Sequence, residues 1–283
     1  MMELWYALVD LLPFAWAESG SMFFMKNALL AVLIISPLFG LLSTMVVQSR
    51  MSFFSDALGH SAFAGIAIGA ICGLASPTWC AVVLAVVFAA LFSLVRHKSD
   101  LASDTVIGVF SSTAVALGIF LSTLGGSSFT RFNSLLVGDI LSVEPGRIGL
   151  LAAILLLVVV LWCVALNKLT LAAVHPALAS SRGVNLLAVE LVFNCLVAVV
   201  VTLSMTWIGL LVINSLLILP GAMARNVARS MKQYNLLAVC GAIVAGIAGL
   251  MVSYYIGAST GASITLVLAV EFVATFALRK YRL

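Results

Sequence analysis

The stretch GLLAAILLLVVVLWCVAL, residues 149–166, contains no charged side chain. A helix of about 20 apolar residues spans the hydrocarbon core of a bilayer, so this stretch predicts a transmembrane helix. Only 8% of the 283 residues are charged, whereas 64% are hydrophobic. So few charges cannot cover a water-soluble surface around so large an apolar fraction. The sequence therefore predicts an all-α, polytopic transmembrane bundle.

The remaining apolar stretches are separated by polar residues or by proline and glycine. We predict about nine spans, near residues 26–48, 53–73, 78–95, 104–124, 147–166, 186–205, 207–222, 234–255 and 261–279. The weakest boundary is SMTWIG, residues 204–209, where a tight turn or a half-helix would separate two spans, and a count of eight is the alternative. Residues 1–25, rich in aromatic side chains, are expected to lie at the membrane interface, before a single transmembrane domain over residues 26–283.

The basic residues predict the orientation, because short loops rich in lysine and arginine stay in the cytoplasm. With the N-terminus outside and the C-terminus inside, eleven of the fourteen basic residues lie on the cytoplasmic side. These are Arg50, Arg96, Lys98, Lys168, Arg182, Arg225, Arg229, Lys232, Arg279, Lys280 and Arg282. The net charge of +4 therefore reflects topology, and no soluble basic module indicates a nucleic-acid partner.

The second predicted span carries two ionisable residues. In SFFSDALGHSAFAG, residues 52–65, Asp56 and His60 are four positions apart and share one face of a helix. An ionisable side chain in the centre of a span costs about 2.5–3.5 kcal/mol and usually marks a cavity or a pathway. A carboxylate beside a neutral imidazole suits a divalent first-row metal ion such as zinc, manganese or iron. Because two ligands are too few for a closed structural site, the pattern indicates a transient stop on a pathway.

Two other roles are open for this pair. Asp56 and His60 would also suit a hydrogen bond between helices or a proton relay. On the other side of the same helix Gly65, Gly69 and Gly73 repeat every four residues, a spacing that lets a neighbouring helix approach closely. One face is thus expected to pack against a helix while the other presents polar groups.

The seventh predicted span is followed by a basic segment. Within LLVINSLLILP, residues 210–220, Asn214 and Ser215 interrupt the apolar run, which indicates hydrogen bonding between helices. Pro220 and Gly221 are expected to end the span before a short amphipathic helix. Within residues 220–232 the apolar side would carry Met223, Val227 and Met231, and the basic side chains are Arg225, Arg229 and Lys232.

The sequence lacks the complete motifs expected of an intramembrane hydrolase. The stretches GHSA at 59–62 and GASI at 261–264 lack the final glycine of GxSG, and no HExxH occurs. There is no Walker A motif, so the chain is not expected to bind ATP in P-loop fashion.

Three stretches, in this order, resemble the membrane permeases of ABC importers for manganese, zinc and iron. They are RMSFFSDALGHSAFAGIAIG at 50–69, WIGLLVINSLLILPGAMARNVARSM at 207–231 and SYYIGASTGASITL at 253–266. The resemblance implies a pore of two permease subunits, identical or homologous, in the bacterial plasma membrane. It also implies cytoplasmic ABC ATPases, where ATP is hydrolysed, and an extracytoplasmic metal-binding protein. The metal ion is then the cargo, and no permanently bound cofactor is expected.

The same resemblance assigns roles to residues. Asp56 and His60 match the metal contacts of the pathway, and residues 220–232 match the segment that docks onto the ATPase. The chain departs from the pattern at Gly59, where serine is common, and at Ala64, where proline is common, so the metal preference does not carry over. The rival interpretations are a siderophore or cobalamin permease and a stand-alone proton-coupled carrier that would use Asp56 and Glu271.

Overall fold

The structure is a computed structural model that describes residues 5–6, 9, 22–73, 76–99, 101–124, 138, 140–143 and 145–279. Most of the predicted interfacial segment, residues 1–25, lies outside the described residues. In the described part of that segment, the indole N–H of Trp5 donates to the Lys26 carbonyl oxygen over 3.0 Å. This bond ties the start of the chain to the first long helix.

Nine helices in the described part of the chain are long and apolar enough to cross a membrane. They are α3 (Phe23–Gln48), α4 (Phe54–Ile71), α5 (Pro77–Lys98), α6 (Ser103–Leu124), α8 (Pro145–Val174), α10 (Leu186–Ile208), α11 (Leu210–Val227), α12 (Met231–Ile256) and α13 (Thr260–Leu278). The short 3-10 helix η1 (Ile140–Ser142) precedes α8, and the short helix α9 (Pro176–Ser181) follows it. The described residues contain no strand, and the prediction of an all-α bundle with nine spans is confirmed.

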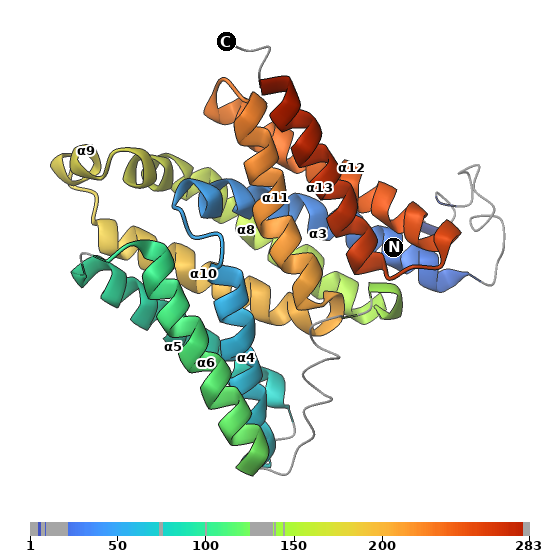
Figure 1. Ribbon diagram of the computed structural model, residues 1–283, viewed down its shortest axis with the longest axis horizontal. Coiled ribbons are helices and arrows are strands. Elements are labelled where there is room, and N and C mark those ends of the chain that lie inside the picture. Colours follow the sequence, from blue (N-terminus) through green and yellow to red (C-terminus); the bar gives the residue numbers. More distant parts are fainter. Residues whose placement is uncertain are drawn as a thin grey trace.

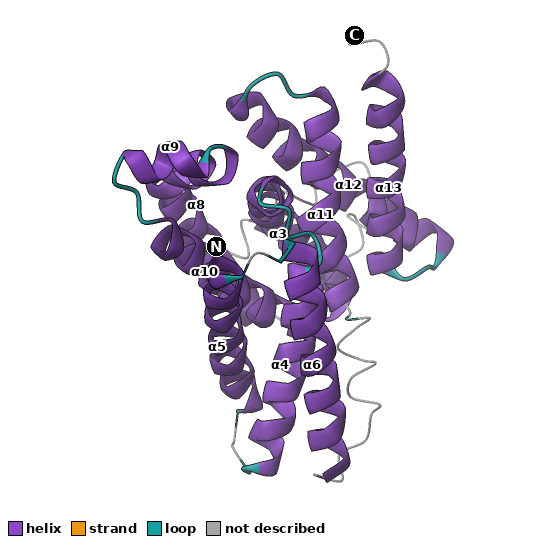
Figure 2. Ribbon diagram, turned by 60° about the vertical axis from the view of Figure 1, so that its left-hand side comes forward, coloured by secondary structure: helices purple, strands orange, loops and turns teal. Residues whose placement is uncertain are grey.

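The long helices form two packed groups (Figure 1). In the first group α4 packs against α5 and α6, and α10 packs against α5. In the second group α11 and α12 pack against each other and against both α3 and α13, and α8 lies against α3. Figure 2 shows α4 and α6 side by side, with α11, α12 and α13 forming a separate cluster. Helices α4 and α11 touch where the two groups meet, and this contact positions the site described below.

A single residue separates α10 from α11. Gly209 caps both helices and has a φ of +87°, a backbone conformation that L side chains rarely adopt. The loop residue Gly138 lies so close that a Cβ there would overlap the backbone of Gly209. The weak boundary at 204–209 is therefore a tight turn between two separate helices.

The predicted break at Pro220 and Gly221 is wrong. Helix α11 continues through both residues to Val227, and the chain leaves the helical conformation only at Ala228. Proline is tolerated inside transmembrane helices because neighbouring helices and local adjustments satisfy the freed backbone groups. Gly221 permits close packing at this point, since a Cβ there would lie 2.6 Å from the Ser43 carbonyl oxygen of α3. No separate amphipathic helix exists between α11 and α12, whose connecting residues are all described.

The three glycines predicted to pack against a neighbouring helix, Gly65, Gly69 and Gly73, have different surroundings. A Cβ on Gly65 would lie 2.5 Å from Ala81 Cα, and one on Gly69 would lie 2.9 Å from Pro77 Cα, so both glycines sit at the contact with α5. Gly73 does not belong to this face. It follows the end of α4, has a φ of +67°, and a Cβ added to it would have no neighbour within 4 Å. The expected packing role of Gly73 is therefore wrong, and its function is to form the turn.

The α4–α5 contact gives a direct test of this packing. We expect Gly65→Ala to lower the free energy of unfolding by about 1–3 kcal/mol, because the new methyl group meets backbone atoms that cannot move aside. The matched control is Gly108→Ala in α6, where a Cβ has no neighbour within 4 Å. Thermal melting of the purified protein measures both variants. Equal melting temperatures for Gly65→Ala and the wild type would contradict the close approach of α4 and α5.

Candidate functional site

Asp56 and His60 lie together at the start of α4. Asp56 is in the first helical turn, and its Oδ2 is 3.3 Å from Nε2 of His60 one turn later. The His60 side chain is 17% exposed and the Asp56 side chain 42%, so neither is sealed inside the bundle of this chain. The free N–H groups at the beginning of a helix stabilise a nearby negative charge, which suits a carboxylate at this position.

A third side chain reaches the pair from another helix. Asn214, in the second turn of α11, donates its Nδ2–H to Asp56 Oδ1 over 3.1 Å. Each oxygen of the Asp56 carboxylate therefore has a polar neighbour, one on α4 and one on α11. The polar interruption in LLVINSLLILP indicated a hydrogen bond between helices, but it carried no information about the partner, which lies 158 residues away.

The packing around the pair fixes how α11 meets α4. A Cβ on Gly59 would overlap the side chain of Leu210, the first residue of α11. The glycine thus leaves room for Leu210 beside the turn of α4 that carries His60. On its other side α11 is joined to α13, because the Thr265 hydroxyl donates to the Ser215 hydroxyl oxygen over 3.0 Å. The site therefore lies between one helix group and the other.

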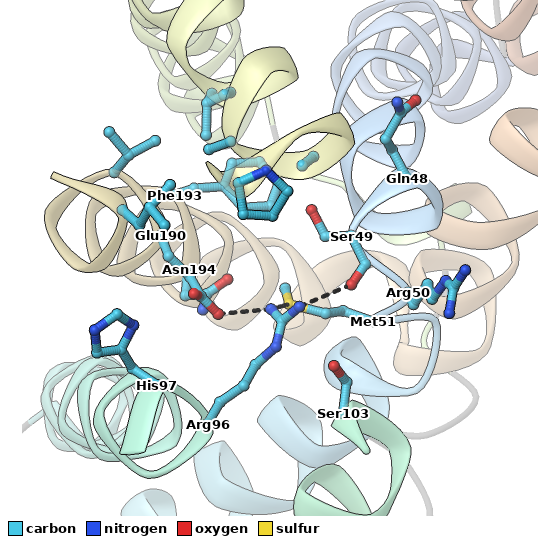
Figure 3. A pocket seen from close by; sticks show the side chains of 16 residues that line it. Gln48, Ser49, Arg50, Met51, Arg96, His97, Ser103, Glu190, Phe193 and Asn194 are labelled. Atoms are coloured by element: carbon cyan, nitrogen blue, oxygen red, sulfur yellow. Dashed lines mark hydrogen bonds and ion pairs between the residues drawn. The ribbon is translucent and has the colours of Figure 1, made fainter. Parts of the chain in front are cut away.

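The turn that leads into α4 is held by an arginine (Figure 3). Arg96 of α5 lines a cavity of about 410 Å³, and its Nη1 is 2.6 Å from Glu190 Oε1 of α10. The same guanidinium donates through Nη2 to the Ser49 carbonyl oxygen over 3.0 Å and through Nη1 to Met51 Sδ over 2.7 Å. These contacts join α5, α10 and the connection from α3 to α4, immediately before the helical turn that carries Asp56.

The described residues of this chain form no closed metal centre. Among them, no group of three or more histidine, cysteine, aspartate or glutamate side chains is placed to hold a metal ion. All five cysteines are free thiols, so none is used in a disulfide. Asp56 and His60 thus form a pair of side chains, and two such groups are too few for a closed metal site.

The six residues predicted to contact an ATPase lie in two helices and the loop between them. Arg225 in the last turn of α11 and Arg229 in the loop are exposed, and so is Lys232 at the start of α12. Met223 differs from the prediction. It is only 6% exposed and lies against Gly241 of α12, inside the bundle, so it is not available to a partner.

Val227 and Met231, the other two apolar residues of this set, are half-buried. Met231 packs against a small cluster formed by Ala224, Tyr234 and Ala238. The expected apolar docking face therefore serves largely to join α11 to α12. The basic side chains are the part of the segment that faces outward.

Nine apolar helices in the described part of the chain, with a polar pair where two helix groups meet, define a multi-pass membrane protein built for transport. Residues 21–279 match the family model described as the ABC 3 transport family, and the chain belongs to this family. The manganese import system permease protein ScaB of Streptococcus parasanguinis is 29% identical over 253 residues, which cover 89% of this chain and 90% of ScaB.

Two further comparisons agree with this assignment. The high-affinity zinc uptake system membrane protein ZnuB of Haemophilus influenzae is 29% identical over 249 residues, 87% of this chain and 94% of ZnuB. Among solved structures, PsaBC from Streptococcus pneumoniae in complex with Fab matches with a TM-score of 0.76 and 25% identity, covering 98% of this chain and 95% of that chain. The resemblance found in the three sequence motifs is confirmed.

Proposed function

We propose that this chain is the permease subunit of an ATP-driven importer for a divalent first-row metal ion, either manganese, zinc or iron. The observation that carries the proposal is the contact of Asp56 with His60 in a chain of the ABC 3 transport family. One carboxylate oxygen and one imidazole nitrogen form a mixed donor set that suits these ions. The names of ScaB and ZnuB, which refer to manganese and zinc, support the same class of substrate.

The geometry indicates how an ion would enter the site. Without an ion, His60 Nε2 and Asp56 Oδ2 are 3.3 Å apart, within reach of a hydrogen bond from an Nε2–H to the carboxylate. A metal ion binds the lone pair of a neutral imidazole nitrogen, so the ion must displace this proton from Nε2. Asp56 Oδ1 stays hydrogen-bonded to Asn214 while Oδ2 turns from the imidazole to the ion.

We propose that a second permease subunit, either a copy of this chain or a homologue, completes the pore. The partial exposure of the Asp56–His60 pair leaves it accessible to groups that do not belong to its own bundle. Two such pairs would place four ligands along one pathway, while each pair alone binds weakly enough to release the ion. The energy comes from separate ATPase subunits, since the chain has no P-loop.

The remaining contacts follow from the predicted orientation, with the C-terminus in the cytoplasm. The exposed side chains of Arg225, Arg229 and Lys232 then face the cytoplasm and are proposed to contact the ATPase. An extracytoplasmic metal-binding protein would deliver the ion at the opposite end of the bundle. In this arrangement the protein resides in the plasma membrane of a bacterium.

Uptake by cells tests the proposed substrate class. Deletion of the gene should lower the cellular content of manganese, zinc or iron in metal-poor medium, as measured by elemental analysis, and the wild-type gene should restore it. The same cells should take up siderophore complexes and cobalamin normally. Loss of siderophore or cobalamin uptake with normal free-ion uptake would instead support the chelate permease. Metal uptake that persists without the ATPase genes would support the proton-coupled carrier.

A further inference from the structure

We infer that α11 couples the ATPase-facing end of the protein to the metal site, and that Asn214 is the positioning residue through which it acts on Asp56. The inference rests on the proposed function, because it concerns the coupling of ATP hydrolysis to ion movement. Its basis is a geometry that the sequence did not predict, namely the continuity of α11 through Pro220 and Gly221.

Continuity places Asn214 and Arg225 on one unbroken helix. Asn214 lies in the second turn of α11 and Arg225 in its last turn. At 1.5 Å per residue, eleven residues of unbroken helix separate them by about 16 Å. A displacement of the Arg225 end is therefore passed to Asn214 through a helix that continues past Pro220, although the missing N–H of this proline removes one helix hydrogen bond. If the helix ended at Pro220, as the sequence predicted, the two ends would be free to move separately.

At the far end the helix is attached to the proposed ligand itself. Asn214 Nδ2 is 3.1 Å from Asp56 Oδ1, so a shift of α11 relative to α4 pulls on the carboxylate or releases it. Helix α11 is also joined to α13 by two hydrogen bonds. The Thr265 hydroxyl donates to the Ser215 hydroxyl oxygen over 3.0 Å, and the Asn226 amide donates to the Thr275 hydroxyl oxygen over 3.5 Å. Helices α11 and α13 are thus tied to each other, and the Asn214 contact is a bond from this pair of helices to the metal site.

A carboxamide is well suited to this position. Its N–H donates to one oxygen of the carboxylate and leaves the other oxygen for His60 and the ion, and it brings no charge that would repel a cation. A bond from a donor to a charged carboxylate is stronger than one between neutral groups, so it limits rotation of the Asp56 side chain. Asn214 acts through Asp56 and is not itself assigned as a metal ligand.

The test measures ion transport and ATP hydrolysis together in liposomes that contain the assembled permease and ATPase. Manganese and zinc ions are each used as the transported probe. Asn214→Leu approximately keeps the side-chain size but removes the donor, and it should reduce the number of ions moved per ATP by about tenfold or more, the effect of losing one charge-assisted hydrogen bond. ATPase association and the rate of ATP hydrolysis should stay near the wild-type values.

Two further variants separate positioning from a general structural role. Asn214→Gln retains an amide donor and should recover a measurable part of the coupling, whereas Ser215→Ala, which removes a bond to α13, should leave the ion-to-ATP ratio near that of the wild type. An unchanged ratio in Asn214→Leu would overturn the inference. So would a loss of transport that follows only the amount of folded protein in both Asn214 variants. If the wild type itself moves neither these two ions nor iron(II), the proposed function fails, which is a different result.

Discussion

Replacing Asp56 or His60 by alanine should reduce metal uptake by the assembled transporter to the background level while most of the protein stays folded. Each change removes one of the two proposed ligands, which lie 3.3 Å apart. Alanine also removes a group that is costly to place in a membrane, so stability should fall only modestly. Asp56→Ala leaves the Asn214 N–H without its acceptor. The loss lowers the free energy of unfolding by about 1–3 kcal/mol for a fully buried group, and by less at this partly exposed site.

Radioactive manganese or zinc uptake into vesicles, paired with a melting curve for each variant, measures this prediction. Asp104→Ala is a matched control, because Asp104 is an exposed aspartate in the first turn of a different helix, α6. It should transport like the wild type. Full transport per folded molecule in both Asp56→Ala and His60→Ala would return the pair to a structural role, that of a hydrogen bond at the start of α4.

Reversing the charge at Arg225 and Arg229 together should abolish association with the ATPase and, with it, uptake. Both side chains are exposed at the junction of α11 and α12, so the double variant Arg225→Glu, Arg229→Glu changes the surface without altering the core. Two basic contacts become two repulsive ones if the partner surface is acidic. Deletion of residues 223–232 is a poorer experiment, because Met223 and Ala224 are buried in the bundle.

Co-purification of the ATPase with the permease measures the association. Arg182→Glu provides the control, since Arg182 is an exposed arginine at the end of α9, on a different cytoplasmic segment in the predicted topology. It should retain the ATPase. Undiminished co-purification with the double variant would refute the docking role of Arg225 and Arg229.

The sequence predicted the helices well because the length and composition of an apolar run largely determine whether it crosses a bilayer. Every predicted span corresponds to a helix, and most boundaries differ by a few residues. The largest difference is at α8, which continues to Val174, beyond the apolar run that ends at residue 166. The orientation stays a prediction from the distribution of basic residues.

The errors arise where tertiary contacts decide the outcome. Pro220 indicates a helix break in isolation, but the neighbouring helix α3 packs closely at Gly221 and the helix continues. Gly73 continues the four-residue spacing of Gly65 and Gly69, yet a glycine in a turn looks the same in sequence as one at a helix contact. The apolar residue Met223 was expected to face a partner, but α12 covers it.

Only the part of the candidate site that lies within a single helix could be predicted from the sequence. Asp56 and His60 could be paired from their spacing, since positions four apart share a helical face. The contact of Asp56 with Asn214 spans 158 residues, and that of Arg96 with Glu190 spans 94. Neither pairing follows from local pattern, because both depend on how separate helices pack.

This chain, together with its partners, is proposed to move a divalent metal ion in a reaction driven by ATP hydrolysis. The most direct measurement is the accumulation of manganese, zinc or iron in liposomes that contain the complete complex and the binding protein, with and without ATP. We expect one of these ions to accumulate against its gradient only when ATP is present. ATP-dependent accumulation of a metal chelate or cobalamin without any of the free ions, or free-ion transport that does not require ATP, would contradict it.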